Sequence, residues 1–325
     1  MRAIVLCAGE GRRMWPLTLE IPKPLLPVAN RPLLDYTLRQ MRAAGAREIL
    51  ANVFHLADVI MSWGGRGGAW GLDIRWLRES QLTGPCGPLR QFLEWCDPDE
   101  AVIVTSSDSV NDFDLVDMRR AHVRSGAVLT IIGKQVEDVR RFGKLNVEQN
   151  GLINGFVEKP AAMRATAGVA SCGTYCVSPR IIQWIPDRDP VDFGDLVRSL
   201  LSEHLPVHCY LSDRYWRDVG TFESFWRANL DLASRVLVGA GERGDTTELA
   251  GVHIEGSVLI SRDSEVGRGV TIVGPAVIGA DVSLGAGCRL ERVVLLPGVS
   301  LGARQTVRDA MLYVHDGKQC IVRFE

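Results

Sequence analysis

The stretch GEGRRMWPLTLEIPKP, which runs from Gly9 to Pro24, directly follows the apolar opening MRAIVLCA. It combines two glycines, two adjacent arginines and a lysine between two prolines. Backbone N–H groups at Gly9 and Gly11 can converge on phosphate oxygens at the end of a strand. Arg13 adds a fixed charge and a fork of donors that matches phosphate geometry. The stretch therefore predicts a phosphate-binding loop behind the first strand of an α/β fold.

This loop differs from the two familiar nucleotide-binding loops. A dinucleotide fingerprint would need a third glycine where the chain has Met14, and the P-loop pattern GxxxxGK[ST] is absent. Pro22 and Pro24 disfavour a regular helix around Lys23 and predict an extended, stiff segment. A glycine pair can be an ordinary turn, and a lysine is usually solvated. The stiff segment beside a phosphate cradle nevertheless favours phosphate binding by Lys23.

Short strand-type runs alternate with helical patterns from residue 1 to about residue 235. The runs RAIVLCA, EILANVF, LDIRWL, AVIVTSS and AVLTIIGKQ are separated by segments such as PLLDYTLRQMRAAG and LVDMRRAHVRSG. Strands separated by helices predict a Rossmann-like, mainly parallel sheet with both faces covered. Ligands bind such sheets at the carboxyl ends of the strands. We therefore expect an α/β domain over residues 1–235 and a linker over residues 236–250.

Beyond the linker, aliphatic residues recur at every sixth position. The first series consists of Ile254, Ile260, Val266, Ile272, Ile278, Leu284, Leu290 and Leu296. A second series of small apolar residues, interrupted at Ser264, consists of Val252, Val258, Val270, Ala276, Val282, Cys288 and Val294. A glycine-rich loop region is the alternative, but a parallel β-helix of hexapeptides explains the period of six. Residues 251–325 are therefore predicted to form a parallel β-helix with the recurrent residues pointing inward.

Composition excludes several classes of function. The chain has 37 Lys and Arg against 39 Asp and Glu, so its formal net charge of -2 gives no basic field for nucleic acid. The 8 cysteines contain no CxxC pair, which favours buried, reduced thiols over disulfides or a zinc site. No apolar run is long enough for a membrane span, and the sequence opens with a strand instead of a signal peptide. We expect a cytoplasmic protein without a membrane partner.

Two isolated carboxylates follow predicted strands. Asp108 comes after AVIVTSS, and Asp218 lies in YWRDVGT. A Mg²⁺ ion that bridges phosphates usually needs only one or two protein carboxylates. An aspartate at a strand-to-helix turn can equally be a helix cap. These residues alone leave both interpretations open.

Several segments together resemble one known family. AGEGRRMWPLTLEIPKPLLPV closely resembles the GGxGTRLxPLT...PKPLxPV signature of the sugar-1-phosphate nucleotidylyltransferases. In the same order along the chain, ESQLTGPCGPL is similar to the nucleotide loop of that family, IVTSSDS to its strand ending in Gly-Asp, GFVEKP to its EKP motif and YWRDVGT to its DVGT motif. With the repeats, the resemblance covers essentially all 325 residues. It implies a nucleotidyltransferase domain over residues 1–235 and a left-handed β-helix over residues 251–325.

The resemblance also implies roles for individual residues. Arg13 and Lys23 would hold the triphosphate, and Asp108 and Asp218 the Mg²⁺ ion, which makes these four the catalytic set. The implied nucleotide-binding set is Ala8, Gly9, Gly11, Gln81, Gly84 and Ser107. The implied sugar-phosphate set is Gly143, Glu158, Lys159 and Ser171. The chain departs from the family pattern in its base, ribose and sugar contacts, at Ala8, Arg12, Ser107 and Ser171.

The implied reaction joins an NTP to a sugar-1-phosphate and releases pyrophosphate. The attacking phosphate oxygen is already anionic near pH 7, because the second pKa of a phosphomonoester is about 6. We therefore expect in-line attack without a general base or a covalent intermediate, and Cys86 and Cys172 are interpreted as packing residues. GTP and mannose-1-phosphate are favoured. The alternatives are dTTP or UTP with glucose-1-phosphate, a modified sugar or cyclitol phosphate, a non-catalytic regulatory subunit, or a tail that transfers acyl groups.

A homo-oligomer is also expected. The segment VVLLPGVSL is unusually apolar for the exterior of a β-helix, and CIVRFE would cap one end. Exposed apolar faces and open strand edges favour association. The β-helix is therefore expected to supply much of the interface.

Overall fold

The computed structural model describes residues 1–159, 165–235 and 251–324. These residues form two compact units that do not follow the order of the chain. The first unit comprises Met1–Gly9, Thr37–Ser107 and Asn111–Trp216, and the second comprises Glu10–Tyr36, Asp108–Val110 and the described part of Arg217–Glu325. The expected linker at 236–250 lies outside the described residues. Within the described ranges, no helix is long and apolar enough to cross a membrane.

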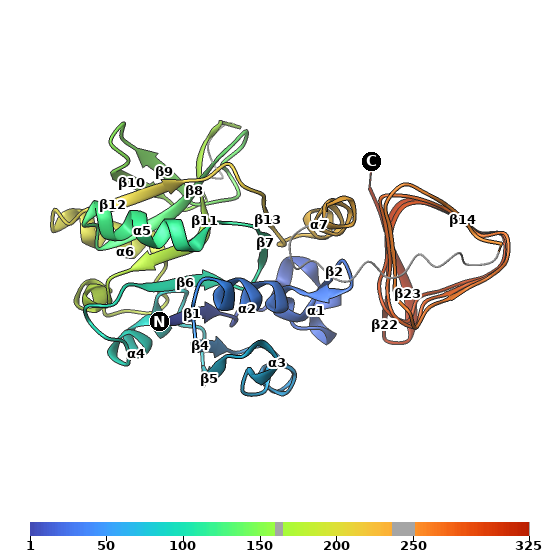
Figure 1. Ribbon diagram of the computed structural model, residues 1–325, viewed down its shortest axis with the longest axis horizontal. Helices are drawn as coiled ribbons and strands as arrows, with labels where there is room; N and C mark the ends of the chain where they lie inside the picture. Colours follow the sequence, from blue (N-terminus) through green and yellow to red (C-terminus); the bar gives the residue numbers. More distant parts are fainter. Residues whose placement is uncertain (160–164, 236–250, 325) are drawn as a thin grey trace. The chain divides into compact units, whose positions relative to one another are not determined.

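A nine-stranded sheet organises the first unit (Figure 1). Its strands are β1 (Arg2–Leu6), β4 (Glu48–Val53), β5 (Asp73–Arg78), β6 (Val102–Ser106), β8 (Leu129–Val136), β9 (Lys144–Val147), β10 (Ile153–Val157), β11 (Gly168–Val177) and β12 (Val207–Leu211). The main path runs β10-β9-β11-β6-β1-β4-β5, while β8 pairs with β11 and β12. The helices are α2 (Leu33–Ala43), α3 (Ala57–Gly64), α4 (Gly87–Glu94), α5 (Leu115–Ser125) and α6 (Phe193–Ser202).

The sheet is parallel in one half and mixed in the other. As predicted, β1 is parallel to β4 and β6, and β4 is parallel to β5. In contrast, β11 is antiparallel to β6, β8 and β9, and β9 is antiparallel to β10. Helical crossovers force parallel pairing in the first half, whereas the short connection from β9 to β10 allows an antiparallel hairpin. The prediction of a mainly parallel sheet is therefore right for the first half, whereas the second half keeps only one parallel pair, β8 with β12, among the described residues.

Local sequence signals set the helix ends around this sheet. The carboxylate of Asp114 accepts a hydrogen bond from the backbone N–H of Asp117 and caps α5, which ends at Gly126 in the left-handed conformation. Asp192 and Asp195 form a reciprocal capping box at the start of α6. These caps fix where each helix begins and ends against the sheet.

The second unit begins with the charged loop of the sequence. It contains the 3-10 turns η1 (Arg12–Met14) and η2 (Lys23–Leu25), the short helix α1 (Leu17–Glu20), and the hairpin of β2 (Pro27–Val28) and β3 (Arg31–Pro32). The strands β7 (Ser109–Asn111) and β13 (Trp216–Asp218) pair in a small sheet. Helix α7 (Phe222–Ser234) follows β13 and is capped by Thr221 and Ser224.

The C-terminal strands stack as successive turns of one coil (Figure 1). They are β14 (His253–Glu255), β15 (Val258–Ile260), β16 (Glu265–Val266), β17 (Thr271–Val273), β18 (Ala276–Ile278), β19 (Ser283–Leu284), β20 (Arg289–Leu295), β21 (Ser300–Leu301), β22 (Thr306–His315) and β23 (Lys318–Arg323). His253 pairs in parallel with Thr271, and Thr271 with Arg289, so each turn contains three six-residue repeats. Ile272, Leu284 and Leu290 are fully or almost fully buried, which confirms the inward series.

The strict spacing of six breaks near the end of the coil. Ile278 pairs with Leu295 instead of Leu296, so one residue is lost from the repeat, and Arg292 within this stretch has a positive φ of 49°. The inward positions then continue through Leu301 and Val307. The predictions of Val294 and Leu296 as inward residues are therefore both wrong, because the coil shortens by one residue at Arg292 and Val293 and Leu295 take the inward positions.

The apolar exterior predicted for VVLLPGVSL is also wrong. Val293, Val294 and Leu295 have no exposed surface, and Leu296 is only 3% exposed. Helix α7 packs against β18 and β20, and the Phe222 ring stacks on Tyr313. The aliphatic side chains are therefore buried within a single chain, which removes the observation on which the oligomer interface was predicted.

Candidate functional site

Lys23 and Asp108 form a close ion pair in the second unit. Pro22 is extended, as expected, but η2 begins at Lys23 itself, so the expectation of a wholly extended segment is wrong there. Pro24 suits the second position of such a turn because its φ is fixed near the helical value. Lys23 is 7% exposed, and its Nζ atom lies 2.6 Å from Oδ2 of Asp108. The backbone therefore aims a buried ammonium group at a carboxylate.

Asp218 is brought to the same place by the small sheet. The backbone N–H of Val219 donates a 2.8 Å hydrogen bond to the carbonyl oxygen of Asp108. A Cβ built at Gly220 would lie 2.6 Å from both Nη2 of Arg13 and Oδ2 of Asp218. These two charged groups therefore face the same bare backbone. The predicted catalytic set, Arg13, Lys23, Asp108 and Asp218, thus belongs to one compact unit, in which two cationic groups lie beside two carboxylates.

Glycine occurs at Gly9 and at Gly11 for different structural reasons. Gly11 has a φ of 68°, and an added Cβ would lie 3.0 Å from the Thr18 side chain, whose hydroxyl donates to the Gly11 carbonyl oxygen. Glycine is therefore required at this position by the fold. A Cβ at Gly9 would meet nothing within 4 Å. The fold leaves open space at Gly9, as a ligand-facing loop needs.

In the first unit, the predicted nucleotide-binding residues follow neighbouring parallel strands. Ala8 follows β1, and Ser107 follows β6 and donates from both its backbone N–H and its hydroxyl to the Leu6 carbonyl oxygen. Gln81 and Gly84 follow β5. Because these strands are parallel, their carboxyl ends meet at one edge of the sheet. The structure thus places Ala8, Ser107, Gln81 and Gly84 in loops at that edge.

A hydrogen-bonded chain that the sequence motifs did not indicate links these loops. The buried Asn52 accepts from the Cys7 N–H at 3.1 Å and donates to Glu79 at 2.6 Å. Glu79 in turn accepts from the N–H and hydroxyl of Thr83. The only sequence signal was an asparagine inside the apolar run EILANVF. Asn52 and Glu79 are positioning residues, because they join the end of β1 to the loop of Gln81.

The same loop is closed at Gly84. Its φ is 81°, and an added Cβ would lie 2.4 Å from the Val191 carbonyl oxygen. That oxygen accepts from the Cys86 N–H, while the Val191 N–H donates to Thr83. Only glycine fits this close approach of two backbone segments. Gln81 itself is exposed.

Three of the four predicted sugar-phosphate residues lie together. Gly143 comes before β9 and Glu158 after β10, and Lys144 pairs with Val157. The Ser171 N–H donates to the Gly143 carbonyl oxygen at 2.8 Å. Phe156 covers Gly143 so closely that an added Cβ would lie 2.3 Å from its ring. Gly143, Glu158 and Ser171 are therefore gathered at one end of this hairpin.

Lys159 differs from its predicted partners. Its side chain is 61% exposed, and its ammonium group lies 2.6 Å from the neighbouring Glu158. Its backbone has a positive φ of 37°. A non-glycine residue in this region is strained unless its surroundings hold it. The ion pair of Glu158 and Lys159 lies directly after the end of β10.

The cysteines are packing residues, as predicted. All 8 are free, and Cys86 and Cys172 are buried. Burial raises the pKa of both thiols, and it outweighs the opposing effects of Arg90 on Cys86 and of Lys134 on Cys172. A buried thiol with a raised pKa carries little thiolate and is a poor nucleophile. This agrees with a reaction that forms no covalent intermediate.

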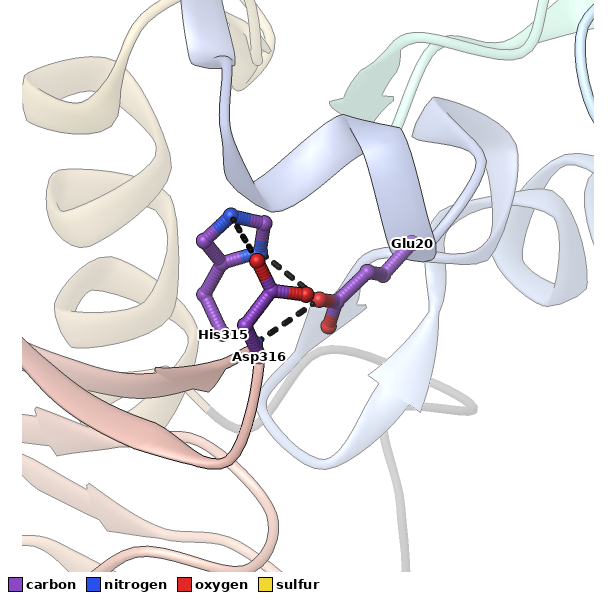
Figure 2. A group of neighbouring side chains, drawn as sticks. All are labelled: Glu20, His315 and Asp316. Atoms are coloured by element: carbon purple, nitrogen blue, oxygen red, sulfur yellow. Dashed lines mark hydrogen bonds and ion pairs between the residues drawn. The ribbon is translucent and has the colours of Figure 1, made fainter.

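A separate polar cluster joins α1 to the β22–β23 turn (Figure 2). Nδ1 of His315 lies 2.7 Å from Oε1 of Glu20, and Nε2 lies 3.6 Å from Oδ2 of Asp316. The Asp316 N–H also donates to Glu20 at 3.1 Å. Each imidazole nitrogen therefore faces a different carboxylate. The cluster holds the C-terminal end of α1, three residues before Lys23, against the tail.

These features are those of a nucleotidyltransferase. Residues 2–235 match the family described as nucleotidyl transferase, and the chain belongs to that family. It is 30% identical to the glucose-1-phosphate thymidylyltransferase of Streptomyces griseus over 95% of this chain and 85% of that protein. It is 29% identical to the UTP–glucose-1-phosphate uridylyltransferase of Synechocystis, over 99% and 88% respectively.

A third relative and a solved structure complete the comparison. The chain is 29% identical to the mannose-1-phosphate guanylyltransferase of Mycobacterium tuberculosis over 93% of this chain and 81% of that protein. The crystal structure of a candidate glucose-1-phosphate thymidylyltransferase from Bacillus anthracis superimposes with a TM-score of 0.66 at 23% identity, covering 74% of this chain and 98% of the other. That likeness shows the fold. The relatives are sugar-1-phosphate nucleotidyltransferases that use three different bases.

Proposed function

We propose that this protein condenses an NTP with a sugar-1-phosphate to give an NDP-sugar and pyrophosphate. The observation that carries the proposal is the grouping of Arg13, Lys23, Asp108 and Asp218 in one unit, with Lys23 bonded to Asp108. The relatives act on such substrates, as their names state. Two cations and two carboxylates are what a reaction between two polyanions requires.

The residues of the chain divide the work. Arg13 and Lys23 bind the triphosphate and neutralise charge on the leaving pyrophosphate. The loops at Ala8, Gly9, Ser107, Gln81 and Gly84 hold the nucleotide, and Gly143, Glu158, Lys159 and Ser171 orient the sugar phosphate. Orientation lowers the barrier because it converts the encounter of two bound anions into an aligned in-line attack.

Asp108 and Asp218 fit a Mg²⁺ site. Their backbones are joined through the Val219 N–H, and Oδ2 of Asp218 points towards the bare backbone of Gly220. Mg²⁺ is usually held by one or two carboxylates together with substrate phosphates. When bound, it would supply positive charge to the reacting phosphates.

For the substrates, we propose GTP and mannose-1-phosphate first. Support comes from the relative of Mycobacterium tuberculosis. The relatives of Synechocystis and Streptomyces griseus support UTP or dTTP with glucose-1-phosphate as the second candidate. A pyrophosphate-release screen of purified protein over five NTPs and a panel of sugar and cyclitol 1-phosphates tests both. Absence of release from every pair with Mg²⁺ would contradict the proposed function and favour a regulatory subunit.

We further propose that the tail is a left-handed parallel β-helix and supports a homo-oligomer. The pairing of each strand with the strand one turn later supports the helix. Among the described residues, β23 pairs only with β22, and such an edge can pair with another chain. Size-exclusion chromatography with light scattering tests the oligomer. A monomer at tens of micromolar would contradict it.

A further inference from the structure

The cluster of Glu20, His315 and Asp316 brings one imidazole and two carboxylates together (Figure 2). One possible ligand atom from each residue lies within 4.8 Å of those from the other two. Among the described residues, no other group of three His, Cys, Asp or Glu side chains comes this close. All three residues belong to the second unit, and none of them is assigned to the reaction.

A hairpin fixes the backbone of two of these residues. His315 ends β22 and pairs with Lys318, which begins β23. Between them, Asp316 and Gly317 have positive φ values of 49° and 67°, as in a two-residue type I′ hairpin turn. The Asp316 N–H donates to the Glu20 carboxylate at 3.1 Å. The turn is therefore held against the end of α1, with the three side chains pointing towards one another.

The cluster carries more negative than positive charge. Among the described residues, neither Glu20 nor Asp316 forms an ion pair with a lysine or an arginine, and His315 is the partner of both. Two carboxylates beside one imidazole leave a net negative charge even when the imidazole is protonated. A divalent cation would offset this charge.

His315 also has a nitrogen that lacks a hydrogen bond. Nδ1 is buried and has no hydrogen-bond partner among the described residues, although Oε1 of Glu20 lies 2.7 Å away. The two atoms are close but are not aligned as an N–H···O bond requires. The side chains of Glu20 and Asp316 are 43% and 82% exposed, so both carboxylates can turn to admit an ion. Ligand atoms of a tetrahedral metal ion lie roughly 3.3 Å apart, which small rotations of these side chains can reach.

We propose that Glu20, His315 and Asp316 form a site for a divalent transition-metal ion, with Zn²⁺ as the best match. An imidazole ligand suits Zn²⁺, whereas Mg²⁺ and Ca²⁺ prefer a shell of oxygen atoms. Zn²⁺ is commonly held by histidine and carboxylate ligands, and three of them leave one position for water. The ion ties the end of α1, three residues before Lys23, to the hairpin of the tail. This inference does not depend on the proposed function.

Calorimetric titration with ZnCl₂ at pH 7.5 tests the site. A background of about 5 mM MgCl₂ keeps sites built only from oxygen ligands occupied. His315→Gln and Asp316→Asn should each weaken Zn²⁺ binding by at least about tenfold, because even groups that only orient a ligand contribute 10- to 100-fold to metal affinity. Asparagine also tolerates the positive φ of Asp316, so this variant keeps the turn. The matched controls are His253→Gln and Asp263→Asn, which replace exposed residues of the tail outside the cluster and should bind as the unmodified protein does.

Thermal unfolding gives a second measurement. Zn²⁺ should raise the melting temperature of the unmodified protein and of both controls, because an ion that binds only the folded chain stabilises it. It should not raise that of His315→Gln or Asp316→Asn. Zn²⁺ binding that is unchanged in both cluster variants, or that is lost instead in Asp218→Asn, would assign the ion to another site and overturn the proposal. No measurable binding up to about 100 μM Zn²⁺, far above the concentration that a built zinc site needs, would overturn it too.

Discussion

The ammonium group of Lys23 lies 2.6 Å from a carboxylate oxygen of Asp108, although 85 positions separate the two residues. Lys23 is buried, whereas the Asp108 side chain is 35% exposed. A buried cation needs a partner to offset its lost hydration. On the proposed function, Lys23 would turn from Asp108 to the triphosphate, and the carboxylate of Asp108 would then be available to hold Mg²⁺.

Replacing either aspartate should stop the reaction without unfolding the protein. We expect Asp108→Asn and Asp218→Asn each to lose at least about 100-fold in turnover, because removing charge from a metal clamp raises the barrier by several kcal/mol. Pyrophosphate release with Mg²⁺ as the only metal measures the loss. Asp263→Asn, on an exposed turn of the tail, is the control. Full activity in either site variant would remove that residue from the site.

Lys23→Met should separate triphosphate binding from metal binding. The substitution keeps much of the buried stem and removes the charge, so kcat/KM for the NTP should fall by about 100-fold. Mg²⁺ binding should not weaken, since a competing cation beside Asp108 is gone. Calorimetric titration with Mg²⁺ and initial rates measure the two effects, with exposed Lys318→Met as the control. Weaker Mg²⁺ binding in Lys23→Met would argue against the exchange of partners.

Gly220→Ala should disturb Arg13 and Asp218 together. The new Cβ would lie 2.6 Å from an atom of each side chain, so both must shift. A small displacement of aligned charges costs about tenfold or more in kcat/KM. Gly68→Ala is the control, because a Cβ at Gly68 meets nothing within 4 Å. Unchanged kinetics in Gly220→Ala, with a normal melting temperature, would show that these two groups do not act at their observed positions.

His122 should make the first unit sensitive to acid. Burial, assisted by the charge of His208, lowers the pKa of His122 to about 4 from an ordinary value of 6.5. The unfolded chain therefore binds a proton between these values that the folded chain does not, and stability falls as pH drops from 6.5 to 4. Over this pH range, the titration of His122 lowers the free energy of unfolding by about 3 kcal/mol.

Urea unfolding at several pH values measures this contribution. The His122→Gln variant should show a shallower loss of unfolding free energy over the same range, since glutamine does not titrate. Near pH 7.5 the variant itself is expected to be less stable, because His122 lies 2.9 Å from the Thr130 hydroxyl. An equal slope in both proteins would assign the acid sensitivity to other groups.

The parallel pairing of the first half could be predicted from the sequence, because each strand there is a short apolar run followed by a helical pattern. The six-residue repeat of the tail could also be predicted, because every inward position of the coil must be apolar. The loss of one residue at Arg292 could not be read, because Val293, Val294, Leu295 and Leu296 are all apolar and any of them could point inward. Pattern alone does not choose the register within such a run.

The residues of the candidate site were predicted from charged residues at strand ends. The residues that position its loops were not predicted. Asn52 and Glu79 lie in ordinary runs, and only the pairing of β1, β4 and β5 brings them together. The cover that α7 gives to the tail was missed for a related reason. Whether an apolar surface faces solvent depends on distant segments of the chain, and local spacing carries no information about them.

The unit that contains Arg13, Lys23, Asp108 and Asp218 is assembled from the beginning, the middle and the end of the chain. During synthesis, Glu10–Tyr36 leaves the ribosome early, while α7 and the coil that packs on it emerge last. Domains generally fold as units, and contacts between distant segments form slowly. The first unit is likewise complete only after Trp216 has been synthesised. A ribosome that stalls in the tail therefore holds a chain in which Asp108 and Asp218 have both been made, while the strands that pack on α7 are still missing.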